Sequence, residues 1–111
     1  MLDELEFRRL AEIALLSLLQ HLIEREEEAE AGFEVDEQAG VLNITFEEPA
    51  GKFVITPNTP VRQIWISALS TSFKLSWSDA AGAFVFEKTG ETLMQLMGRI
   101  LSEQLGSPVS V

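Results

Sequence analysis

The fold of this chain is decided by the stretch Val41-Leu-Asn-Ile-Thr-Phe-Glu47, in which every second residue is apolar. This is the side-chain period of a β-strand that buries only one face. The same alternation occurs in Gln63-Ile-Trp-Ile-Ser67 and in Phe73-Lys-Leu-Ser-Trp77. Turn residues separate the alternating stretches, at 38–40, 49–51, 57–60 and 78–82. Residues 33–88 therefore predict about six short antiparallel strands that form one sheet with a single covered face.

Both ends of the chain show a helical period instead. In residues 3–30, apolar side chains recur every three or four positions, with Asp3 as the helix N-cap and Gly32 as a stop. A second helix opens at Thr89-Gly-Glu-Thr92 and ends before Gly106. Two helices can cover the apolar face of one sheet. The sequence therefore predicts an α+β fold, a two-layer α/β sandwich with the element order helix, about six strands, helix.

Length and composition limit the functions that are open to the chain. The 111 residues suit a single domain that spans 1–111, and 46% hydrophobic residues are enough for a packed core. The chain has no cysteine and one histidine, His21, which excludes thiolate-bound clusters and multi-histidine metal sites within one chain. A net charge of −10 argues against nucleic acid as the partner and favours cations or a basic protein surface.

The negative charge is concentrated in the first part of the chain. Residues 1–48 hold 14 acidic and three basic residues, whereas residues 49–111 hold four acidic and five basic ones. The acids between positions 24 and 37 are candidate metal ligands, because carboxylate oxygens suit hard cations. The candidates near the helix end are Glu24, Glu27, Glu28 and Glu30, and those on or beside the strand that follows are Glu34, Asp36 and Glu37. An acidic run is also what an ordinary solvated surface contains, so both interpretations stay open from the residues alone.

Trp65 is a candidate anchor for a partner protein. If Ile64 and Ile66 point into the core, Trp65 points outward with Gln63, and Asn43 shares the same open face. An exposed tryptophan in a polar surrounding is a good hot spot for protein binding. The alternative is a tryptophan that lies flat on the sheet as partial cover.

Several stretches of the sequence together resemble the frataxin family. The segment 53–67 is similar to the most characteristic strands of that family, a Thr-Pro turn followed by Gln-Ile-Trp-Leu-Ser, which is Gln63-Ile-Trp-Ile-Ser67 here. Further matching segments are Arg9-Leu-Ala-Glu12, Gly40-Val-Leu-Asn-Ile-Thr-Phe46, Lys74-Leu-Ser-Trp77 and Thr89-Gly-Glu-Thr-Leu93. They cover nearly the whole chain in order. The resemblance implies an α-β(6)-α fold with two helices packed on one antiparallel sheet.

The resemblance also implies a function. Frataxins bind iron weakly through an acidic ridge on the first helix and the first strand. They also bind the cysteine desulfurase and the scaffold protein of iron–sulfur cluster assembly. The ridge positions correspond here to Glu12, Glu24, Glu27, Glu34 and Asp36, and the sheet-face partner site corresponds to Gln63 and Trp65. We therefore expect an accessory protein that holds Fe²⁺ or Fe³⁺ loosely at its surface and is not an enzyme.

The first helix departs from the family pattern. Where frataxins usually carry acids, this chain has Ile13, Leu16, Gln20 and Ile23. These residues form a second stripe away from the core face, which predicts a homodimer or a docking surface through Ile13, Leu16 and Ile23. Two alternative functions stay open, a protein-interaction regulator that has lost iron binding and a weak ferroxidase.

The first residues of the chain bear on its location. Met1-Leu-Asp-Glu-Leu-Glu6 is similar neither to a secretory signal, which has a basic start, nor to a mitochondrial transit peptide, which is poor in acids. The longest apolar stretch is too short for a bilayer. The sequence predicts a cytoplasmic protein with no membrane or nucleic-acid partner, and the resemblance implies a bacterial member of the family.

Overall fold

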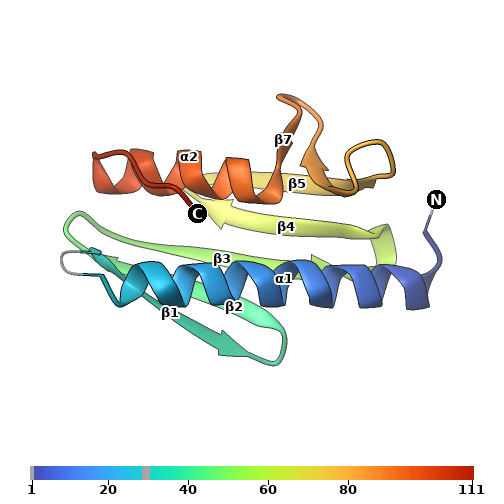
Figure 1. Cartoon of the computed structure of the whole chain (residues 1–111), viewed down its shortest axis with the longest axis horizontal. Coiled ribbons are helices and arrows are strands. Elements are labelled where there is room, and N and C mark those ends of the chain that lie inside the picture. Colours follow the sequence, from blue (N-terminus) through green and yellow to red (C-terminus); the bar gives the residue numbers. More distant parts are fainter. Residues whose placement is uncertain (1, 29–30) are drawn as a thin grey trace.

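The structure is a computed structural model that describes residues 2–28 and 31–111. One layer is a seven-stranded antiparallel sheet, and two helices form the other layer (Figure 1). The elements are α1 (Glu4–Glu26), β1 (Phe33–Gln38), β2 (Val41–Glu47), β3 (Ala50–Asn58), the 3₁₀ helix η1 (Thr59–Val61), β4 (Gln63–Ala68), β5 (Thr71–Ser78), β6 (Ala83–Phe86), β7 (Glu91–Thr92) and α2 (Leu93–Leu105). The strands cross the sheet in chain order. The predicted α+β sandwich is confirmed, with a seventh strand in addition to the six expected.

Helix α1 begins where the sequence predicts and ends earlier. The carboxylate of Asp3 accepts a hydrogen bond from the backbone N–H of Glu6 at 2.8 Å, which caps the first turn. The helix ends at Glu26 and not at residue 30. Leu22 is its last buried residue, and the next inward position holds Arg25. Without an apolar side chain to anchor a further turn, and with acids that oppose the helix dipole at this end, the helix stops.

Helix α2 is fixed at both ends by local contacts. The backbone N–H of Gln95 donates to the Thr92 hydroxyl at 3.3 Å, and the Thr92 N–H donates to the Gln95 side chain at 2.9 Å. Gly106, with φ of 72°, ends the helix. The segment 89–92 was expected to open the helix. It instead adds the two-residue strand β7 beside β6, and the helix begins at Leu93.

Tight turns set the register of the sheet. Ala39 and Gly40 join β1 to β2 with φ values of 52° and 84°. Leu69 and Ser70 join β4 to β5 with φ values of 53° and 59°. Two-residue turns with positive φ at both positions match the twist of antiparallel strands, so the register is fixed and alternate residues keep to one face.

The core lies between the two layers. Its largest fully buried side chains come from both helices and from the inward face of the sheet: Phe7, Leu18, Leu22, Leu42, Ile44, Phe53, Ile55, Ile64, Ile66, Leu75, Phe84 and Leu96. Among the described residues, no polar or charged residue is classed as buried. Both helices lie on the same side of the sheet (Figure 1), so the other face is open, as the strand pattern predicts. Neither α1 nor α2, the two α-helices within residues 2–28 and 31–111, has the length and apolar character that a membrane span requires.

Candidate functional site

Trp65 lies on the open face of the sheet, in the middle of β4, where it is half-buried. Its indole N–H donates a hydrogen bond to the side-chain oxygen of Gln63 at 2.9 Å, and the Gln63 amide donates to the Ser76 hydroxyl at 3.2 Å. Lys74 is the register partner of Trp65 on β5, and its Nζ lies 4.7 Å from the centre of the indole ring. The indole is therefore held in one orientation by its neighbours.

Asn43 joins this surface to the edge of the sheet. On β2 it stands in register between Asp36 on β1 and Val54 on β3. The next outward-facing residue of β3, Thr56, is the register partner of Trp65. The partner-binding candidates on the sheet thus share one open face, as the alternation predicts.

Two of the predicted metal ligands belong to the same open face. Glu34 and Asp36 are exposed on the edge strand β1, and both point away from the helices because Phe33 and Val35 occupy the inward positions. Alternate residues of a strand are about 7 Å apart. The first two acids of the open face therefore lie along the sheet edge and not under α1.

Two further acids near this edge of the sheet are not among the predicted ligands. Glu34 stands opposite Thr45, which makes Glu47 its diagonal neighbour on β2. Glu34, Glu47 and Glu48 line one shallow hollow of about 360 Å³. The strand register is the signal that finds them, since the turn at 39–40 determines which residues of β2 lie beside β1.

Of the predicted ligands between positions 24 and 37, Glu37 lies on β1, and Glu30 lies outside the described residues.

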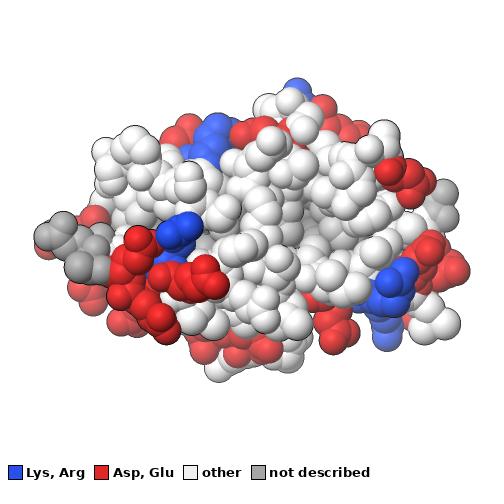
Figure 2. Space-filling view, viewed as in Figure 1, with Lys and Arg blue, Asp and Glu red and all other residues white. Residues whose placement is uncertain are grey.

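The remaining predicted ligands lie on α1 or directly after its end. Glu24 and Glu27 are exposed at its end, and Glu28 is paired with Arg25 at 3.0 Å. Figure 2 shows acidic side chains gathered around this end of the helix layer. Glu12 is exposed in the first half of the helix, about 18 Å before Glu24 along the axis.

The carboxylates therefore do not form one compact cluster. Within residues 2–28 and 31–111, no group of three histidine, aspartate or glutamate side chains is placed to hold a metal ion. Exposed carboxylates are hard oxygen donors, so their chemistry fits a loosely held, hydrated cation. The same charges create a negative field that attracts a basic surface.

The predicted second stripe of α1 is exposed. Ile13, Leu16 and Ile23 keep 55%, 53% and 40% of their surface in solvent. The inward face of the same helix, which includes Leu15 and Leu18, is buried in the core.

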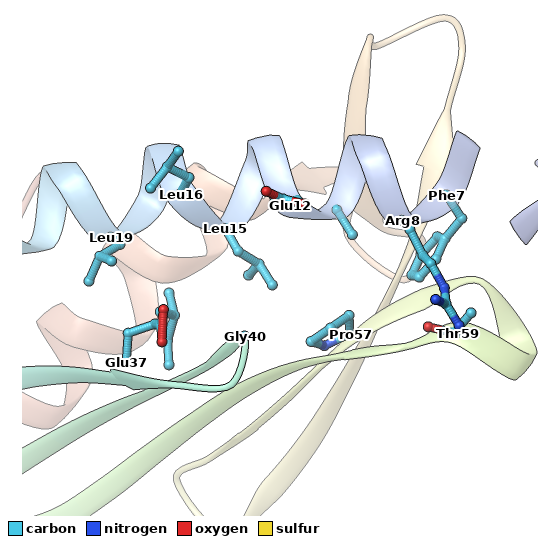
Figure 3. A pocket seen from close by; sticks show the side chains of 12 residues that line it. Phe7, Arg8, Glu12, Leu15, Leu16, Leu19, Glu37, Gly40, Pro57 and Thr59 are labelled. Carbon is cyan, nitrogen blue, oxygen red and sulfur yellow. The ribbon is translucent and has the colours of Figure 1, made fainter. Parts of the chain in front are cut away.

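A groove of about 510 Å³ lies between α1 and the strand ends beneath it (Figure 3). Figure 3 shows Leu15 and Leu19 extending from the helix toward Glu37 and Gly40. The walls are largely apolar, and Arg8, Glu12 and Glu37 add charge to the lining. No local sequence pattern predicts this groove, because its width depends on the distance between α1 and the β1–β2 turn.

The ion pair of Arg99 and Glu91 lies away from the open face of the sheet and from the exposed stripe of α1. Arg99 on α2 donates two hydrogen bonds to Glu91 on β7, at 2.9 and 3.0 Å. These hydrogen bonds hold the pKa of the Glu91 carboxyl below its usual value, although partial burial opposes the shift. The pair ties the last strand to the second helix.

A family model described as a frataxin-like domain matches residues 1–107. Over 80 residues, the chain is 29% identical to the iron–sulfur cluster assembly protein CyaY of Azotobacter vinelandii, with 72% of each chain covered. It is also 29% identical to the mitochondrial frataxin of Arabidopsis thaliana over 112 residues, which cover 99% of this chain and 59% of the relative.

A solved structure supports the fold. The frataxin of Psychromonas ingrahamii matches with a TM-score of 0.76 and 22% sequence identity, over 98% of this chain and 97% of that chain. The two-layer arrangement is therefore the frataxin fold. With the family model covering nearly every residue, the chain belongs to the frataxin-like family.

Proposed function

We propose that this chain is an accessory protein of iron–sulfur cluster assembly in the bacterial cytoplasm. It docks on the cysteine desulfurase and the scaffold protein and carries weakly bound iron. Its membership of the frataxin-like family and the names of its CyaY relatives support the pathway. The observation that carries the proposal is that an acidic edge strand and a fixed tryptophan share one open face of the sheet.

The two parts of this open face have different tasks in docking. The acids Glu34 and Asp36 lie at the edge, where they steer a basic partner surface into contact. Trp65 lies further in and supplies a large aromatic surface, with Gln63 and Asn43 as polar neighbours. Because neighbours already hold the indole, little side-chain entropy is lost when a partner covers it.

Iron is cargo in this proposal and not a resident cofactor. The carboxylates at the end of α1 and on β1 provide the oxygen ligands: Glu24, Glu27, Glu28, Glu34 and Asp36, with Glu12 further along the helix. Their exposure and their separation support weak binding, because each ion keeps most of its water ligands. Weak binding suits a protein that must release iron again.

One alternative function has a specific observation in its favour. The described residues contain no three-ligand group, and the middle of α1 is apolar where iron-binding relatives are expected to have acids. A regulator that only docks, without binding iron, fits this observation as well. A weak ferroxidase fits it less well, because a two-metal site needs ligands that hold both ions within about 4 Å.

A cluster-assembly assay tests the proposed function. The purified desulfurase and scaffold receive cysteine and Fe²⁺, and cluster formation is followed by absorbance with and without the chain. We expect the chain to change the rate, and Trp65→Ala to abolish the change. An unchanged rate at saturating concentration of the wild-type chain would contradict the proposal. Trp77→Phe, at a tryptophan packed against Phe84, serves as the control.

An anaerobic NMR titration with Fe²⁺ separates the proposal from its alternative. If amide signals of residues 24–28 and 31–36 broaden selectively at low iron equivalents, the acids bind iron. If they broaden only at large excess, the chain is a docking regulator without iron. Oxygen consumption with Fe²⁺ tests the ferroxidase, and we expect no consumption above the background rate.

A further inference from the structure

Helix α1 carries a regular seam on its outward side. Arg9, Ile13, Leu16, Gln20, Ile23 and Glu27 recur at alternating intervals of four and three residues. This spacing keeps side chains on one side of a helix and is the spacing by which helices pack in pairs. The apolar members of the seam are exposed, whereas the buried residues of α1 lie on the opposite side. The seam is therefore available to another molecule.

The two ends of the seam carry opposite charges. Arg9 lies near the start of α1 and Glu27 directly follows its last residue, and both are exposed. Arg8 is paired with Glu4 at 3.0 Å, but Arg9 takes part in none of the ion pairs formed within residues 2–28 and 31–111. Figure 2 shows an uncharged stretch along the middle of the helix layer, with charged groups of both signs toward its two ends.

We propose that this seam binds a second copy of the chain, with the two α1 helices antiparallel across a two-fold axis. In this register Arg9 of one copy meets Glu27 of the other. Ile13 meets Ile23, and Leu16 meets Gln20. Each contact forms twice, because a two-fold interface is self-complementary. A parallel pair would set Arg9 against Arg9 and Glu27 against Glu27, which repel each other.

The association is expected to be weak. A single helix face lies at the small end of specific interfaces, and a net charge of −10 on each copy opposes contact. The dimer therefore forms at high protein concentration and at moderate ionic strength, where the overall repulsion is screened.

Sedimentation velocity from about 10 μM to about 1 mM tests the proposal at the concentrations where a weak dimer is populated. We expect the weight-average mass to rise from 12.3 kDa toward twice that value. Leu16→Glu should weaken association by more than about tenfold, since it places a charge in the centre of the seam. The control is Val61→Glu, which adds the same charge at a residue that is 51% exposed and lies outside α1.

A charge exchange tests the register. Arg9→Glu and Glu27→Arg should each weaken the dimer, and the double variant should restore it to within about threefold of the wild type. Circular dichroism checks that each variant is folded. A wild-type chain that stays monomeric at the highest concentration overturns the proposal, as does a Leu16→Glu chain that associates normally. A double variant no better than the single ones overturns the antiparallel register.

Discussion

The open face of the sheet and the outward face of α1 are both exposed surfaces, but they hold their side chains differently. On the sheet, the indole of Trp65 is fixed by the side chain of Gln63 and by the ammonium group of Lys74. On α1, the apolar side chains of the seam are between 40% and 55% exposed. The indole on the open face is thus held by contacts within the fold, whereas about half of the surface of the apolar seam side chains contacts only solvent.

Helix α1 carries two apolar stripes, one buried in the core and one exposed. A stripe of leucines and isoleucines on a helix can pack into the core, or it can be exposed and bind another molecule. The three- and four-residue spacing of the apolar side chains is the same in both cases. Burial distinguishes them: Leu18 is completely buried, and Leu16 is 53% exposed. Stability measurements should therefore respond to one face of α1 and association measurements to the other.

The largest expected effect is on stability. Leu18→Ala should lower the free energy of unfolding by about 2–5 kcal/mol, because it leaves a cavity in the core. Leu16→Ala, at matched chemistry on the other face, should change it by less than about 0.5 kcal/mol. Urea unfolding of both variants at low protein concentration checks this. A comparable loss in the two variants would show that the seam belongs to the folded core.

The next effect concerns the open face. Trp65→Ala should weaken binding to the scaffold protein by about 10- to 100-fold, as truncation of an aromatic hot spot does. Isothermal titration calorimetry gives the affinity, and Trp77→Phe is the control because Trp77 forms its aromatic contact with Phe84. If Trp65→Ala binds the scaffold protein as tightly as the wild type does, the indole only shields the sheet from solvent and does not contribute to binding.

A smaller effect is expected at the acidic edge. Asp36→Asn should slow association with the desulfurase about two- to threefold at low salt, and the difference should vanish at high salt. Stopped-flow fluorescence measures the rate constants. Glu87→Gln removes the same charge from an exposed position outside β1 and the end of α1, so it should leave the rate nearly unchanged. Equal slowing by both variants would mean that only net charge matters.

The smallest expected effect is on stability, at the ion pair of Glu91 and Arg99, which lies outside the open face and the seam. Because the Arg99 hydrogen bonds lower the pKa of Glu91 in the folded state, the pair stabilises the fold above about pH 4.5. This contribution is lost as the pH falls through the lowered folded-state pKa. Glu91→Gln should cost about 0.5–1 kcal/mol at pH 7 and less in acid. Urea unfolding at pH 7 and pH 3 checks this, and a pH-independent difference would contradict it.

Much of the fold could be predicted from local patterns. The alternation in 41–47 and 63–67 predicts the sheet, its covered face and the outward direction of Trp65. The three- and four-residue spacing predicts both faces of α1. These predictions succeed because each depends on neighbouring residues of one element.

The parts that could not be predicted depend on contacts between distant residues. Helix α1 ends near Arg25, whose Nε donates to the backbone carbonyl of Ser110 at 2.9 Å, 85 residues away. Strand alternation turns Glu34 and Asp36 onto the open face, while Glu24 and Glu27 lie at the end of α1. No local pattern gives the position of α1 relative to β1, and that position separates the acids.

The most direct test of the docking claim is an NMR titration of the ¹⁵N-labelled chain with the unlabelled complex of desulfurase and scaffold. We expect the signals of the Trp65 indole N–H and of the Asn43 and Asp36 amides to shift or broaden at substoichiometric amounts of the complex. Signals of Glu87 and Lys88 should stay in place. If the signals of the open face do not change while the complex binds elsewhere on the chain, the open face is not the docking surface.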